Sequence, residues 1–133
     1  MKVIEKEKLV IRDSFILPFA GGEIWCTELD SLSIYTDVVK NKFLNDMDTI
    51  RKPSSPAAIG INLTNTLIDT DIADLIIKEL NSIKRPIRVA IIGINIKGKM
   101  KFNFELKKQE GFFVYKYFTD PEKAKEWLIL NNQ

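Results

Sequence analysis

The stretch from Ala57 to Leu80, AAIGINLTNTLIDTDIADLIIKEL, constrains the fold of this chain more than any other. Ala57 to Leu63 is apolar except for Asn62, and such a run is typical of a strand that is covered on both faces of a parallel sheet. After a polar turn, apolar residues recur with helical spacing from about Asp71. A buried strand that leads into an amphipathic helix predicts an α/β fold.

Two further apolar segments extend this alternation. Ile87–Ile94 and Phe112–Phe118 each predict a strand, so two crossovers must join three parallel strands. The second crossover, Asn95–Glu110, fits both the alternation of a strand and the spacing of a helix. A helix is favoured, because right-handed connections between parallel strands are most often helical. Helices on both faces of the sheet follow.

The ends of the chain supply the remaining elements. Three short strands are predicted in the amino-terminal third, at Lys8–Ile11, Ser14–Phe19 and Glu23–Leu29. From Thr36 the spacing becomes that of an amphipathic helix, which ends before Pro53. A last helix has Asp120 as its cap and Pro121 at its first position. We expect one α/β domain over residues 1–133, with a four- to five-stranded mixed sheet and about four helices.

Composition narrows the classes of function. The chain has 133 residues, and its net charge of +2 comes from basic and acidic residues that are interleaved, which does not favour nucleic acid as a partner. No apolar run approaches the roughly 20 residues that a bilayer span needs, and the charged amino terminus does not resemble a signal peptide. We expect a cytoplasmic protein without integral membrane association.

The absence of histidine and the single cysteine limit the chemistry further. Histidine is the commonest general base near neutral pH and the commonest zinc ligand, so chemistry that depends on it is excluded. Cys26 stands alone, which excludes an intrachain disulfide, and no positive neighbour in the sequence would activate its thiol. No metal or cofactor is expected. An enzyme would depend on carboxylates or lysines.

The order of elements from residue 57 to residue 130, together with the closing residues Phe118, Asp120, Ala124, Trp127 and Leu128, resembles the STAS superfamily, most closely the small bacterial SpoIIAA-like proteins. In that family, a phosphorylated Asp-Ser-Ser-Gly turn at the start of a helix controls the exchange of protein partners. The resemblance implies that Asp69-Thr70-Asp71-Ile72 is the corresponding turn, with Thr70 as the candidate phosphoacceptor. Asp71 stands where the family has the second serine, and Ile72 where it has glycine.

These residues are compatible with three functions. The leading hypothesis is a non-enzymatic regulatory module of STAS type that binds a protein partner or small ligand near the Asp69–Ile72 turn. An exposed strand edge would also allow a homodimer. The first alternative is a carrier of an apolar or lipid ligand, held between sheet and helices beside Trp25, Phe43 and Phe104. The second is an enzyme based on the carboxylates of Asp69 and Asp71.

A group of lysines lies in the second crossover, at Lys97, Lys99, Lys101, Lys107 and Lys108. They make the predicted helix basic. Such a helix can present a solvated face, and it can also meet a phosphorylated ligand, an anionic lipid surface or an acidic partner.

Overall fold

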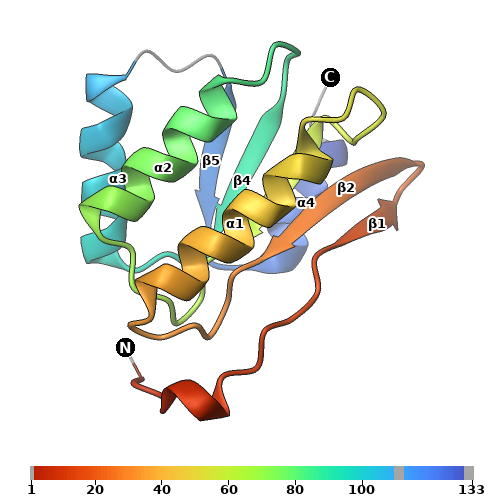
Figure 1. Ribbon diagram of the computed structural model, residues 1–133. Coiled ribbons are helices and arrows are strands. Elements are labelled where there is room, and N and C mark those ends of the chain that lie inside the picture. Colours follow the sequence, from red (N-terminus) through yellow and green to blue (C-terminus); the bar gives the residue numbers. More distant parts are fainter. Residues whose placement is uncertain (1, 110–112, 131–133) are drawn as a thin grey trace.

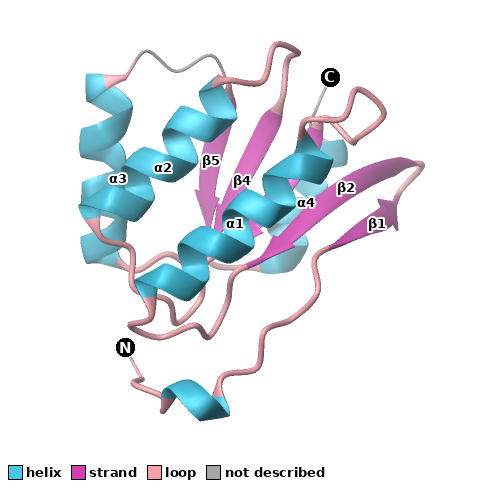
Figure 2. Cartoon of the chain, viewed as in Figure 1, coloured by secondary structure: helices cyan, strands magenta, loops and turns pink. Residues whose placement is uncertain are grey.

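A computed structural model describes residues 2–109 and 113–130, which form a five-stranded mixed sheet with helices on both faces (Figures 1 and 2). In chain order the elements are β1 (Phe15–Phe19), β2 (Gly22–Glu28), α1 (Thr36–Ile50), β3 (Ala58–Asn62), α2 (Thr70–Asn81), β4 (Arg88–Ile92), α3 (Ile96–Lys108), β5 (Val114–Phe118) and α4 (Pro121–Ile129). The predicted α/β class is confirmed. The predicted boundaries at Glu110 and Phe112 lie outside the described residues.

The strands lie in the sheet in the order of the sequence, from β1 to β5. β1 runs antiparallel to β2, while β2, β3, β4 and β5 are all parallel. The register places Cys26, Gly60, Ala90 and Lys116 in one row across the parallel strands. The predicted set of three parallel strands within residues 57–118 is therefore confirmed, and β2 adds a fourth.

The two faces of the sheet are covered unequally (Figure 1). The three crossover helices, α1, α2 and α3, lie on one face, and α4 lies on the other. Side chains alternate along each strand, so Ile59 and Ile61 of β3 enter the large core under α1 and α2, while Ala58 enters the smaller cluster under α4. A single short helix therefore covers the second face.

The amino-terminal segment departs from the prediction, because Lys8–Ile11 is not a strand. After a 3-10 turn at Lys6–Lys8, the segment continues without regular structure to β1 (Figure 2). Polar contacts fix it instead: Ile4 accepts a hydrogen bond from the Tyr35 hydroxyl at 2.7 Å, and Lys6 pairs with Asp37 at 3.1 Å. Ile4 and Lys6 are thus tied to the start of α1, and this part of the segment does not pair with a strand.

The second crossover is helical, as topology predicts. Asn95 caps α3 by accepting a hydrogen bond from the backbone N–H of Gly98 at 2.8 Å. At Gly98 a Cβ would lie within 3.2 Å of Ile68 and 3.0 Å of Ile94, so the start of α3 packs close to the loop before α2. Among the described residues, no helix is long and apolar enough to span a bilayer.

Candidate functional site

An open cavity of about 330 Å³ lies between the sheet and the beginning of α4. Its apolar lining comes from β1 to β4 and from α4, at Phe15, Leu17, Ile24, Cys26, Gly60, Ile92, Pro121, Ala124 and Leu128. Its polar lining comes from Arg12, Glu28, Asn62 and Lys125. The cavity therefore has an apolar floor and polar groups near the carboxyl ends of the parallel strands, where α/β sheets usually bind ligands.

Small residues on this face of the sheet create the space. Gly60 lies in the middle of β3, and a Cβ there would meet Ile92, Ile24 and Leu128 at 3.7 to 4.0 Å, which is ordinary van der Waals contact. Its neighbour in β4 is Ala90, which is also small. A Cβ at position 60 would therefore fit against these neighbours, and a larger side chain would take space from the cavity.

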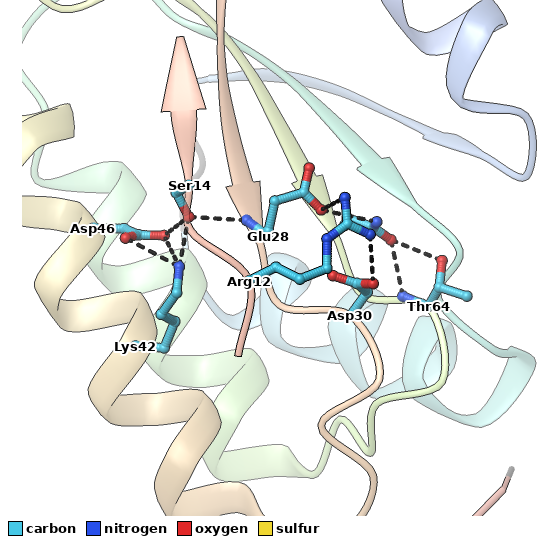
Figure 3. Close-up of polar contacts among 8 residues, drawn as sticks. Arg12, Ser14, Glu28, Asp30, Lys42, Asp46 and Thr64 are labelled. Carbon is cyan, nitrogen blue, oxygen red and sulfur yellow. Dashed lines mark hydrogen bonds and ion pairs between the residues drawn. The ribbon is translucent and has the colours of Figure 1, made fainter. Parts of the chain in front are cut away.

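A hydrogen-bonded network holds the polar groups at one end of the cavity (Figure 3). The guanidinium of Arg12 lies 3.1 Å from Asp30 and 3.9 Å from Glu28. The side-chain amide of Asn62 donates to Glu28 Oε2 at 3.1 Å and accepts from the hydroxyl of Thr64 at 2.7 Å. The Glu28 side chain is only 10% exposed, so its charge is balanced by Arg12 and its orientation is fixed by Asn62.

A second cluster ties the beginning of β1 to α1 beside this network (Figure 3). The hydroxyl of Ser14 donates to Asp46 Oδ2, and it accepts from Lys42 Nζ at 2.6 Å and from the backbone N–H of Glu28 at 3.0 Å. Lys42 and Asp46 also pair directly at 3.1 Å. Ser14 thus connects the backbone at Glu28 with a largely buried ion pair.

Cys26 lies in the floor of the cavity and is half-buried. Burial raises the pKa of its thiol to about 11, and the negative charge of Glu28 acts in the same direction, while Lys125 opposes both. The thiol is therefore protonated at neutral pH, which makes Cys26 a small apolar lining residue rather than a nucleophile.

The predicted turn lies at the start of α2, outside the cavity lining. Asp69 caps the helix by accepting from the backbone N–H of Ile72 at 2.8 Å, and Ile72 itself is buried. Thr70 and Asp71 are exposed, and Asp71 lies 3.9 Å from Lys40. The carboxylates of Asp69 and Asp71 are thus used for capping and for a surface ion pair, and they do not form a desolvated pair.

The structure does not bring Trp25, Phe43 and Phe104 together. Trp25 and Phe43 belong to the large core, where the indole N–H of Trp25 donates to Thr27 at 2.6 Å. Phe104 points outward from α3 with 60% of its surface exposed, and Phe102 takes the buried position instead. The cavity of about 330 Å³ lies instead under α4, on the opposite face of the sheet from Trp25 and Phe43.

Sequence reasoning did not single out Arg12, Glu28, Asn62 and Lys125. Asn62 carried a usable signal, because it is the one polar residue in the otherwise apolar run from Ala57 to Leu63. A polar side chain at the end of a buried parallel strand points to the edge where ligands bind. Arg12 had no such signal, since its partners are distant in sequence.

Comparisons with known proteins do not show a family for this chain. No family model matches the chain, and no curated protein or solved structure matches it either. Within residues 2–109 and 113–130, no group of three or more acidic or cysteine side chains is placed to hold a metal ion. The geometry of the cavity is therefore the basis for a functional proposal.

Proposed function

We propose that this protein is a non-enzymatic binding module for a small molecule with an apolar body and a polar end. The observation that carries the proposal is the cavity under α4, whose volume of about 330 Å³ lies within the usual range for ligand sites, roughly 300 to 1,000 Å³. An apolar lining with a few fixed polar groups is also what such sites have in common.

The lining suggests how a ligand would lie. Its apolar body would rest on Gly60 and Cys26 and against Leu128 of α4. Its polar end would meet Lys125 and Asn62, which offer hydrogen-bond donors at the rim. The network around Glu28 is formed within the protein itself, so this end of the site is ordered before a ligand arrives.

Two features favour binding over turnover. The thiol of Cys26 keeps its proton to about pH 11, so it is a poor nucleophile under physiological conditions. The Oε2 atom of Glu28 already accepts a hydrogen bond from Asn62 and lies 3.9 Å from Arg12. This oxygen is therefore engaged within the protein, whereas a general base must be free to reach a proton of the substrate.

Titration with 1-anilinonaphthalene-8-sulfonate, an aromatic anion that fluoresces in apolar sites, tests the proposal. Gly60→Val should narrow the cavity at its floor and reduce the fluorescence gain while thermal unfolding shows an intact fold. Lys125→Met should weaken binding, and Lys123→Met is its control, because Lys123 is exposed on the same helix and outside the lining. Equal binding by Gly60→Val and the parent protein would refute the proposal.

A second candidate is a regulatory role of STAS type at the Asp69–Ile72 turn. It is favoured by the exposed Thr70 at the first position of α2, where the positive end of the helix dipole stabilises a phosphate. Incubation with native cytosol and ATP, followed by intact-mass measurement, should show one added phosphoryl group that Thr70→Val prevents. An unchanged mass in both proteins would remove this candidate.

A further inference from the structure

The outward face of α3 carries a continuous apolar ridge, formed by Ile96, Met100 and Phe104. Their exposed fractions are 78%, 65% and 60%. Residues four apart stand above one another on a helix, so the three side chains form a single ridge about 12 Å long. Three large apolar side chains gathered on one exposed helix face indicate an interaction surface.

The opposite face of α3 is already packed. Gly98, Phe102 and Glu105 are its buried residues, and the ring of Phe102 meets Tyr117 of β5 edge to face at 6.4 Å between centroids. The helix is therefore held in the fold without the ridge. The exposed side chains of the ridge are therefore available to contact another molecule.

Lysines lie on both sides of the ridge, at Lys97, Lys99, Lys101, Lys107 and Lys108. The one acidic residue of α3, Glu105, is buried and lies 3.6 Å from Lys108. Five lysines and one glutamate give α3 a formal charge of +4, whereas the whole chain carries +2. Positive charge is thus concentrated on this helix, while the rest of the chain is slightly acidic.

We propose that α3 lies flat on an anionic lipid bilayer. The ridge enters the boundary between headgroups and acyl chains, and the lysines on either side meet lipid phosphates. Charge complementarity selects an anionic surface, and the apolar ridge distinguishes a bilayer from nucleic acid, whose backbone would require lysines at the centre of the contact. The cavity under α4 lies on the other face of the sheet, so this proposal is independent of the proposed function.

Flotation of the intact protein with lipid vesicles tests the proposal. The protein should float with vesicles of phosphatidylcholine and phosphatidylserine, and much less with phosphatidylcholine alone. High salt should weaken the binding, because it screens the lysines. Met100→Ser with Phe104→Ser should reduce vesicle binding on the order of tenfold or more. Lys97→Gln with Lys101→Gln should reduce it by roughly fivefold for each lysine.

Matched controls come from exposed positions elsewhere. Val10→Ser with Ile11→Ser removes exposed apolar side chains from the amino-terminal segment, and Lys84→Gln with Lys123→Gln removes two exposed lysines outside α3. Both controls should bind vesicles like the parent protein. The proposal would be overturned if the parent protein did not float or if it bound neutral vesicles equally well. It would also be overturned if size-exclusion chromatography showed a dimer that Met100→Ser with Phe104→Ser converts to a monomer, because the ridge would then contact a second copy.

Discussion

At the scale of single residues, Gly93 shows how one position fixes the turn between β4 and α3. Its φ of +74° lies in the left-handed region, and a Cβ there would overlap the side chain of Thr64. Thr64 in turn holds Asn62, which orients Glu28. The absence of a side chain at position 93 therefore supports the polar end of the cavity.

Gly93→Ala and Gly21→Ala separate backbone strain from steric overlap. Gly21 also has a positive φ, of +85°, but a Cβ there meets open space. Gly21→Ala should lower the free energy of unfolding by about 1 to 2 kcal/mol. Gly93→Ala should lower it by about 1 to 3 kcal/mol more, because Thr64 must move. Denaturant titration measures both, and equal losses would contradict the proposed overlap.

The raised pKa of Cys26 predicts how its reactivity depends on pH. Alkylation by iodoacetamide should accelerate up to about pH 11 in the folded protein, whereas in denaturant it should level off near the ordinary pKa of 9.0. Because the folded state prefers the thiol, the stability that Cys26 contributes is present below pH 9.0 and lost as pH rises through about 11. The Cys26→Ala variant should not show this loss of stability at high pH. A rate that levels off near pH 9 in the folded protein would disagree with a buried thiol.

Residue roles were harder to predict from the sequence than residue burial. The capping role of Asp120 was predicted, because it depends only on neighbours within one turn. The role of Arg12 depends on partners 16 and 18 positions away, Glu28 and Asp30, which only the folded chain brings together. Local patterns carry no information about such contacts.

At the scale of elements, the beginning of β1 is fixed to α1 through Ser14. Ser14→Ala should lower the free energy of unfolding by about 1 to 3 kcal/mol, because it leaves the Glu28 N–H and the Asp46 carboxylate short of a partner. Thermal and denaturant unfolding measure the loss. Ser54→Ala is the control, since Ser54 is exposed in the loop after α1. An equal, small effect of both changes would show that the cluster is not stabilising.

Most elements could be predicted because each repeats a local pattern: continuous apolar runs for β3 and β4, helical spacing for α1 and α2. The prediction of a strand at Lys8–Ile11 was wrong, because this segment has the composition of a strand but no neighbouring strand with which to pair. In α3 the spacing of Ile96, Met100 and Phe104 fits a helix, but the segment also alternates like a strand, so topology rather than spacing predicted the helix. Helical spacing also cannot tell an inward face from an outward one. Packing decided that Phe102 faces the core.

At the scale of the whole molecule, the large core under α1 and α2 and the small cluster under α4 predict unequal local stability. Amides of β3 and β4 should exchange with solvent slowest, close to the limit of global unfolding, because both faces of these strands are covered. Amides of α4 and of the edge strand β1 should exchange faster. Hydrogen exchange followed by NMR measures this order, and equally slow exchange in α4 and α2 would contradict it.

The position of α4 has a consequence for how the cavity fills. This helix follows β5 through residues 119–120 alone, and it is fastened to β4 where Arg88 donates to the carbonyl of Trp127 at 2.8 Å and stacks on its indole. A small tilt of α4 about that fastening would widen the entrance while the packing of α1, α2 and α3 stays unchanged. The tilt of this one helix would then set the size of the proposed ligand, at little cost to the stability of the whole protein.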